Sequence, residues 1–255
     1  MFTESIDVAQ VVLYVFWLFF FGLIFWLRRE DRREGYPLET DNPRRIWPTT
    51  TVLIPRAKTF ILPHGGEVKA PNFARDDRPM EATRTAEATG APWEPTGDPL
   101  LSGVGPAAWA NRKDEIDTTR TGEDLIAPLR AAHEFVISAG ADPRGWNVVA
   151  ADGKVAGTIT DLWIDRADTM VRYLEVKLAG AEETRLIPMP MLRVCKSDGR
   201  TKNRVEVSSL KAAQFPLVPR IKLADRITTL EEEKISAFYA GGRLYSDPER
   251  VEPRL

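Results

Sequence analysis

The chain has 255 residues, of which 35 are basic and 37 acidic, so it is nearly neutral. A neutral chain has no electrostatic reason to bind nucleic acid strongly, and we expect no nucleic-acid partner. Cys195 is the only cysteine, and His64 and His133 are the only histidines. This count excludes an internal disulfide and argues against a histidine-based metal site.

Residues 8–27 form an uncharged run of twenty residues. As a helix the run would be roughly 30 Å long, which matches the hydrocarbon core of a bilayer. Glu4 and Asp7 precede it and four arginines follow at 28, 29, 32 and 33. The positive-inside rule then places residues 1–7 in the periplasm and the rest of the chain in the cytoplasm. A cleaved signal peptide fits poorly, because the basic start and the small-residue cleavage site are missing.

The predicted span contains no histidine and no charged residue, so it offers no imidazole to a chlorin magnesium or an iron. Gly22 stands alone and forms no GxxxG pairing motif. Trp17 falls near mid-membrane, although tryptophan prefers the interface. Two interpretations stay open for it: packing against another protein or a pigment, and exposure to lipid.

Residues 28–110 read as an extended, irregular surface arm. The stretch 35–110 holds 11 of the 19 prolines together with Trp47, Phe60, Phe73 and Trp93. An irregular segment of this length is unusual inside a compact domain. We therefore expect an arm that lies across a partner, with only 59–63 forming a short strand.

After a connecting segment at 111–145, residues 146–220 read as a small closed β-barrel. Short apolar runs separated by turns give five or six strands. Gly157 suggests a bulge or a close backbone approach. In 172–178 the alternation places Leu174, Val176 and Leu178 on one face and Tyr173, Glu175 and Lys177 on the other.

Residues 221–255 are expected to form a helix and a tail. Thr229 followed by Glu232 reads as a capping box, and Gly241-Gly242 as the C-terminal cap. The predicted fold class is therefore one N-terminal transmembrane helix, an irregular arm, a mainly β cytoplasmic domain and a short C-terminal helix.

Spaced motifs along almost the whole chain resemble the H subunit of the photosynthetic reaction centre of purple bacteria. They are RREDRREGYPL at 28–38, KTFILPHG at 58–65, PTGDP at 95–99, VGPA at 104–107, AGT at 156–158, DLWID at 161–165, RYLE at 172–175, LEEEK at 230–234 and YAGG at 239–242.

The resemblance implies a barrel of the PRC type and a non-catalytic subunit of the bacterial inner, photosynthetic membrane. Its partners would be the L and M subunits, which it would cap on their cytoplasmic face, and membrane lipid; a light-harvesting ring is a further candidate partner. The bacteriochlorophylls, bacteriopheophytins, quinones and non-haem iron would lie in the partner subunits, and this chain would bind no cofactor directly. It would shield the secondary quinone site and help deliver protons to it.

Proton delivery needs ionisable groups, because a carboxylate can hold and release protons near the working pH. By resemblance, Asp168 and Arg172 match an acidic and a basic position near the quinone site, and Asp165 lies beside them. The alternative is that Asp168 is a turn residue and Arg172 its exposed ion-pair partner. Glu232 also matches an acidic family position, although the capping box already accounts for it.

In some relatives of that family the proton-uptake surface holds an aspartate and two histidines, and the matching stretch here has no histidine. Either Asp117, Glu123 or Asp124 serves as the entry, or protons enter elsewhere; each of the three is also interpretable as part of a solvated loop. Two alternative functions stay open. One is an independent membrane-anchored PRC-barrel protein that binds a soluble partner. The other is an enzyme, for which no nucleophile set, phosphate loop or zinc spacing is present.

Overall fold

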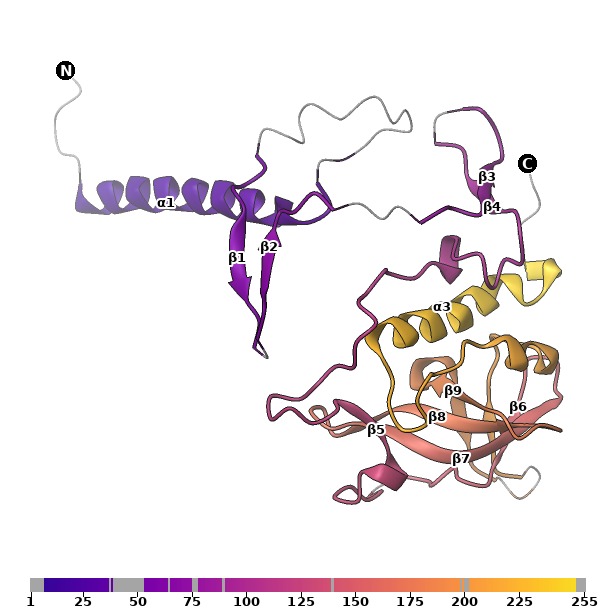
Figure 1. Cartoon of the computed structure of the whole chain (residues 1–255). Helices are drawn as coiled ribbons and strands as arrows, with labels where there is room; N and C mark the ends of the chain where they lie inside the picture. Colours follow the sequence, from indigo (N-terminus) through magenta and orange to yellow (C-terminus); the bar gives the residue numbers. More distant parts are fainter. Residues whose placement is uncertain are drawn as a thin grey trace. The chain divides into compact units, whose positions relative to one another are not determined.

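The computed structural model (Figure 1) divides into two compact units, residues 1–77 and 78–255. The residues whose structure is described are 7–36, 38, 53–63, 65–74, 78–88, 90–138, 140–197, 199 and 202–250. Trp47 and His64 lie outside these ranges.

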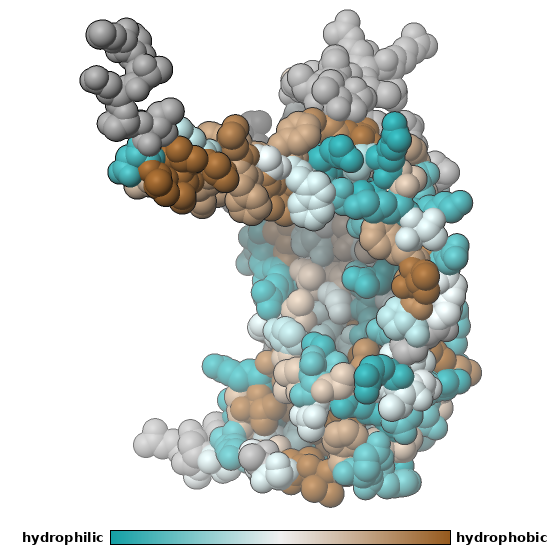
Figure 2. All heavy atoms as spheres, turned by 90° about the vertical axis from the view of Figure 1, so that its left-hand side faces the viewer, coloured by the Kyte–Doolittle hydropathy of each residue, from teal (hydrophilic) through white to brown (hydrophobic). Residues whose placement is uncertain are grey.

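The first unit is dominated by the helix α1 (Val8–Glu30), which begins at Asp7, whose side chain accepts a hydrogen bond from the Ala9 amide at 3.4 Å. It is the one helix among the described residues that is long and apolar enough to cross a membrane, over Val8–Arg33 with a mean hydropathy of 2.4. The predicted apolar helix is confirmed, and it ends three residues later than expected. In Figure 2 its side chains form a predominantly brown surface. Trp17 makes ring contacts with Phe16, Phe20 and Phe21 of the same helix.

A hairpin is tied to the end of α1 by Arg33. The hairpin pairs β1 (Lys58–Ile61) with β2 (Glu67–Ala70) in antiparallel register. The Arg33 guanidinium donates to Glu30 at 2.7 and 2.9 Å and to the carbonyl oxygens of Arg56 and Ala70 at 3.0 and 2.9 Å. Lys58 donates to the same Glu30 carboxylate at 3.0 Å.

The second unit begins with another short hairpin, formed by β3 (Ala82–Arg84) and β4 (Trp93–Pro95). The expectation of a single strand in the arm was therefore wrong. Strands of three or four residues show too little alternation to stand out among prolines. The hairpins leave large apolar side chains in solvent, and Ile61 is 82% exposed.

A seven-stranded sheet forms the centre of the second unit. Its strands run in the order β10-β11-β6-β7-β8-β9, and β5 pairs with β7. Their bounds are β5 Ile126–Pro128, β6 Asn147–Val149, β7 Val155–Asp165, β8 Met170–Leu178, β9 Thr184–Pro188, β10 Arg193–Cys195 and β11 Arg204–Glu206. All pairs are antiparallel except β11 with β6. The ladder ends at β9 and β10 and is not closed, and β5 comes from the segment expected to be a connection.

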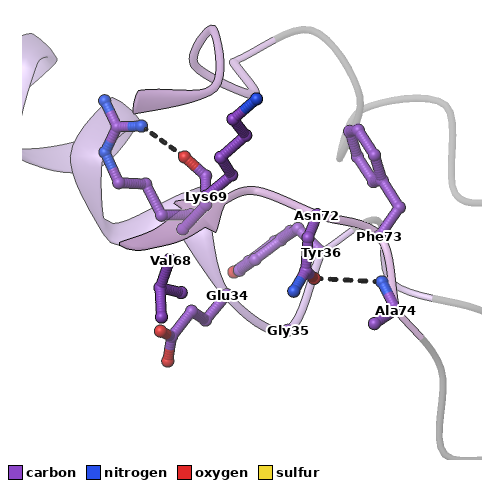
Figure 3. A pocket seen from close by; sticks show the side chains of 10 residues that line it. Glu34, Gly35, Tyr36, Val68, Lys69, Asn72, Phe73 and Ala74 are labelled. Atoms are coloured by element: carbon purple, nitrogen blue, oxygen red, sulfur yellow. Dashed lines mark hydrogen bonds between the residues drawn. The ribbon is translucent and has the colours of Figure 1, made fainter. Parts of the chain in front are cut away.

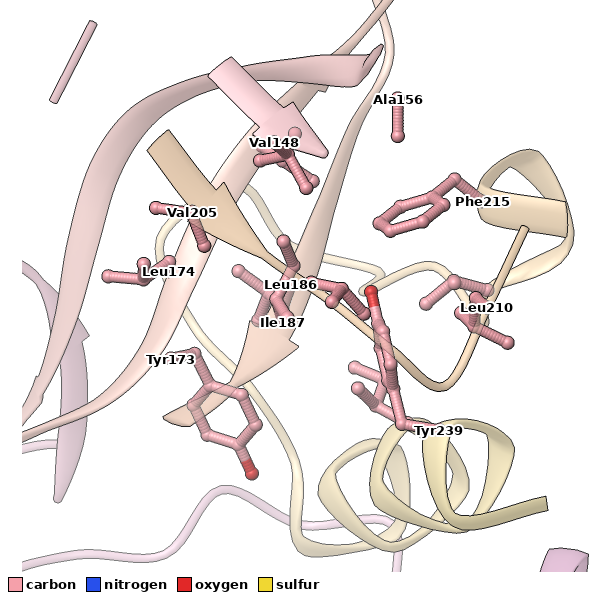
Figure 4. Close-up of a cluster of buried hydrophobic side chains, with 14 of the residues drawn as sticks. Val148, Ala156, Tyr173, Leu174, Leu186, Ile187, Val205, Leu210, Phe215 and Tyr239 are labelled. Carbon is pink, nitrogen blue, oxygen red and sulfur yellow. The ribbon is translucent and has the colours of Figure 1, made fainter. Parts of the chain in front are cut away.

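The long β7–β8 hairpin is buried on both faces. Leu174, Val176 and Leu178 belong to one hydrophobic core cluster with Phe215 and Tyr239. Figure 4 labels ten of the buried side chains of this cluster, Leu174 among them. Tyr173 and Glu175, which alternate with these leucine and valine residues along β8, are also buried, at only 5% and 7% exposed. The Glu175 carboxylate accepts hydrogen bonds from Trp163 Nε1 at 2.9 Å and Arg130 Nη1 at 2.8 Å, which compensates for its burial.

Gly157 lies where β7 approaches β8 too closely for a side chain. A Cβ there would stand 2.1 Å from the Lys177 carbonyl oxygen. The adjoining β6–β7 pairing also skips Ala156, since Val148 faces Gly157 and Val149 faces Val155. The bulge and the close approach that Gly157 suggested are both present.

The helix α3 (Thr229–Tyr245) differs from the sequence-based expectation in two respects. Its capping box consists of Thr228 and Glu231, one residue earlier than predicted, so it does not involve Glu232. Gly241 and Gly242 do not cap the helix but lie inside it. A Cβ on Gly241 would stand 2.7 Å from the Ala107 Cβ, and one on Gly242 2.5 Å from the Ser209 carbonyl oxygen. The glycines therefore permit close packing.

We predict that Gly242→Ala destabilises the second unit, although alanine is the better helix former by about 1 kcal/mol. The added methyl group would collide with a backbone oxygen, and overpacking of this kind costs about 1–3 kcal/mol. Denaturant unfolding of the full chain in detergent, followed by far-UV circular dichroism, measures the difference. Ala240→Gly in the same helix gives the propensity effect alone. A Gly242→Ala protein at least as stable as the wild type would contradict the close packing.

Candidate functional site

A cleft of about 460 Å³ opens in the second unit between α3, the turn end of the β7–β8 hairpin, the end of β9 and the segment that leads into β5. Its walls combine charged and polar groups with apolar side chains. They are Arg112, Asp117, Leu125, Ile126, Asp165, Arg172, Tyr173, Pro188, Pro190, Met191, Thr229, Glu232, Glu233 and Ser236.

Asp165 is the last residue of β7, and its side chain holds the turn between β7 and β8 through hydrogen bonds. Its carboxylate accepts hydrogen bonds from the backbone amides of Ala167 and Asp168, at 2.9 and 3.0 Å, and from Arg172 Nε at 3.0 Å. The Asp165 side chain is only 3% exposed. These three hydrogen bonds compensate for the burial of the Asp165 carboxylate, and they fix the positions of the turn and of the Arg172 side chain.

Asp168 lies at the tip of the same turn and does not line the cleft. Its side chain is 58% exposed and forms an ion pair with Arg172 Nη2 at 3.0 Å. This is the arrangement of a turn residue with an exposed ion-pair partner. Arg172 also lines the cleft, so it connects Asp168 with the groups inside.

Glu232 is a partly buried carboxyl group between α3 and the sheet. The Tyr173 hydroxyl donates a hydrogen bond to its Oε2 at 2.8 Å. Burial raises the pKa of Glu232, the charges of Asp117 and Asp165 raise it further, and the Tyr173 hydrogen bond and the Arg172 charge oppose the rise. Burial and the Glu232 charge also raise the pKa of Tyr173, which keeps the phenol protonated as the donor.

The predicted site residues divide into three groups. Asp117, Asp165, Arg172 and Glu232 line one cleft. Asp168 joins them through Arg172.

Glu123 and Asp124 lie apart from the cleft. Glu123 forms an ion pair with Arg166 at 3.4 Å. Asp124 accepts two hydrogen bonds from Arg226, at 2.5 and 2.7 Å, and this contact lowers the pKa of Asp124. These two carboxylates are thus engaged at other points of the surface.

Sequence reasoning missed Tyr173 and the ion pair between Arg112 and Glu233, at 2.6 Å. Tyr173 and Glu232 are 59 residues apart, so no local spacing connects them. The one available signal was the position of Tyr173 next to Arg172 on a strand. Among the residues whose placement is described, no three His, Cys, Asp or Glu side chains gather as a metal ion would require.

The cleft can hold a proton on a carboxyl group whose pKa is raised above that of an ordinary glutamate. The neutral form of Glu232 is favoured by burial and the ionised form by a phenol and a guanidinium. A group balanced in this way can gain and lose a proton nearer to neutral pH than an ordinary glutamate.

We predict that Tyr173→Phe raises the pKa of Glu232 further, because the lost hydrogen bond stabilises the ionised carboxylate. The carboxyl C=O band in infrared spectra recorded across a pH series follows the titration, and Glu232→Gln identifies the band. Glu182→Gln, on an exposed carboxylate paired with Lys177, is the matched control. A band that titrates identically in wild type and Tyr173→Phe would show that the hydrogen bond has no such effect.

Comparison with known protein families gives two matches that together cover most of the chain. Residues 1–131 match the N-terminal region of the photosynthetic reaction centre H-chain, and residues 136–214 match the PRC-barrel domain. The first match spans α1, both hairpins and β5, and the second spans the rest of the sheet. The chain therefore belongs to the H-chain family and is an H subunit of the photosynthetic reaction centre, with a PRC-barrel domain.

Proposed function

We propose that α1 spans the bacterial inner, photosynthetic membrane and that the second unit, with its β-sheet, lies on the cytoplasmic side. The charges at the two helix ends support this orientation. Asp7 caps the N-terminus, and Arg28 and Arg29 occupy the last turn. Cations at the C-terminal end also interact favourably with the helix dipole.

The proposed role is that of an accessory subunit, not an enzyme, which caps the cytoplasmic face of the L and M subunits. Exposed apolar side chains in the two hairpins and directly after β2 support it, among them Phe60, Ile61, Phe73 and Trp93. Such residues gain stability when a partner covers them. In this proposal the bacteriochlorophylls, bacteriopheophytins, quinones and non-haem iron are held by the partner subunits, and a light-harvesting ring surrounds the complex.

The second part of the proposal is proton delivery to the secondary quinone site, which this subunit would shield from bulk water. The single observation that carries it is the partly buried Glu232 carboxyl group, which is hydrogen-bonded to Tyr173 and lines a cleft with Asp117, Asp165 and Arg172. A protonated Glu232 can release its proton into the cleft, where water and neighbouring carboxylates carry it onward. Arg172 stabilises the carboxylate left behind, and a proton from the cytoplasm restores the neutral form.

We predict that Glu232→Gln, and by a smaller factor Asp168→Asn, slows the second proton-coupled electron transfer to the quinone in the assembled reaction centre. A positioned proton-transfer group contributes about 10²-fold or more, which sets the scale for Glu232. Asp168 acts only through Arg172, so its loss should matter less. Flash-induced absorbance changes with a pH-indicator dye follow electron transfer and proton uptake together. Primary charge separation should stay at the wild-type rate, and unchanged proton uptake in both variants would reject the role.

We also predict that deleting residues 1–27 weakens assembly with L and M, because the deletion removes most of α1. Co-purification from native membranes, read by the chlorin absorption spectrum, measures the loss. A truncated protein that still co-purifies in full would make the arm the anchor instead. A full-length chain isolated without any chlorin-bearing polypeptide would favour an independent membrane-anchored barrel protein.

A further inference from the structure

The first unit also has a cleft, of about 440 Å³, where the residues after α1 meet those of β2 (Figure 3). Its polar groups do not converge, because the Lys69 ammonium lies on the other side of β2 from the side chains of Tyr36 and Asn72. Groups that act on one another gather instead in the second unit, around the cleft that holds Glu232.

One wall of that cleft is reached by residues 109–116, which we call the strap and which run along α3 toward its N-terminus. The Thr229 hydroxyl donates a hydrogen bond to the Lys113 carbonyl oxygen at 2.6 Å. The Thr229 amide donates to the Glu115 carbonyl oxygen at 2.9 Å. The strap leads directly to Asp117, which lines the cleft. The position of the Asp117 carboxylate therefore depends on how firmly the strap is held.

The side-chain contacts of the strap with the start of α3 are open to water. Arg112 forms an ion pair with Glu233 at 2.6 Å, and Asp114 accepts a hydrogen bond from the Thr228 hydroxyl at 2.8 Å. Both Arg112 and Asp114 are exposed. Because water competes for exposed polar contacts, each of these holds the strap only weakly.

Trp109 is the largest side chain of the strap, and it is half-buried. The Lys234 ammonium of α3 lies over its ring, 4.7 Å from the centroid, and the Arg78 guanidinium lies over it at 3.8 Å. Arg78 also donates a hydrogen bond to the Trp109 carbonyl oxygen at 3.0 Å. A Cβ on Gly103 would stand 3.2 Å from Trp109 Nε1, so the backbone there lies close against the ring. Since tryptophan is the aromatic residue that attracts cations best, Trp109 joins the strap to α3 and to the segment at Arg78.

The Asp117 charge acts on Glu232 and raises its pKa. The size of this effect depends on the distance between the two carboxyl groups. On its other side Asp117 is held by the Leu125 amide, which donates to the Asp117 carbonyl oxygen at 2.8 Å. The other charged or titratable groups in the walls of the cleft are Arg112, Asp165, Arg172, Tyr173 and Glu233.

We propose that Trp109 is a positioning residue for proton delivery, which holds the strap on α3 and thereby keeps Asp117 close to Glu232. The inference rests on the proposed function, because it concerns the same carboxyl group. With the strap released, Asp117 would move away from Glu232. The ionised form of Glu232 would then lose a repulsive neighbour, and the pKa of Glu232 would fall.

The experiment follows the infrared carboxyl band of Glu232 across a pH series in the full chain in detergent. Trp109→Leu changes no formal charge, and we expect it to lower the pKa of Glu232 by most of the shift that Asp117→Asn produces. Trp109→Phe retains an aromatic face for the cations and should titrate nearly as the wild type does. Trp93→Leu is the matched control, because Trp93 also has a cation over its ring, Arg84 at 5.0 Å, but belongs to the hairpin β3–β4. It should leave the titration unchanged.

A double variant tests whether Trp109 acts through Asp117. In the Asp117→Asn background, Trp109→Leu should add little further shift, and an undiminished shift there would overturn the proposal. An unchanged titration in Trp109→Leu alone would also overturn it. If far-UV circular dichroism shows that Trp109→Leu does not fold, Thr229→Val decides, because it removes the hydrogen bond to Lys113 without changing a charge. Thr229→Val should lower the pKa of Glu232, and the wild-type titration in this variant would count against the strap.

The failure of this inference and that of proton delivery are distinguishable. Normal proton uptake in Glu232→Gln reaction centres would reject proton delivery, whatever the Trp109 variants show in the infrared titration. An unchanged Glu232 titration in Trp109→Leu would reject the positioning role even if Glu232→Gln slows proton uptake. If both proposals hold, the pH dependence of proton uptake in Trp109→Leu reaction centres should shift to lower pH, and Trp109→Phe should restore it.

Discussion

The arrangement of side chains in the cleft of the second unit depends on one buried carboxylate, that of Asp165. Its three hydrogen bonds hold two backbone amides of the β7–β8 turn and the Arg172 guanidinium. The same residue pairs with Ile126 of β5, so the turn is also attached to the segment that carries Asp117 into the cleft. Without these contacts Arg172 would be a long, exposed side chain with many rotamers. With them it has a fixed position between the solvent and the buried groups.

The position of Glu232 follows from how closely α3 approaches its surroundings. Two adjacent glycines bring the far end of the helix against Ala107 and Ser209 without room for a methyl group. At the near end, Thr228 and Glu231 share the capping box, which leaves Glu232 to face Tyr173. The burial that raises the pKa of Glu232 is therefore a consequence of backbone packing elsewhere along the helix.

Much of the fold could be predicted because its signals are local. An uncharged run of twenty residues between acidic and basic flanks specifies a span, and turn residues between short apolar runs indicate strands. One error came from a signal that two neighbouring positions share. Thr228 and Thr229 are each followed three residues later by a glutamate, so the sequence does not decide between two capping boxes. The burial of Glu175 could not be predicted from its own strand, because its partners, Arg130 and Trp163, come from other elements.

The cleft itself was beyond sequence reasoning for a physical reason. A carboxyl group has a raised pKa only when desolvation exceeds the hydrogen bonds and opposite charges around it, and both terms are set by tertiary contacts. The pKa of Glu232 depends on the charges of Asp117 and Asp165, although the three residues are spread over more than a hundred positions of the sequence. Asp168, the carboxylate that the family resemblance emphasised, lies at the exposed end of this set. Asp168 reaches the cleft only through its ion pair with Arg172, whereas Glu232 lines the cleft itself, so Glu232 is the more direct candidate for the proposed proton delivery.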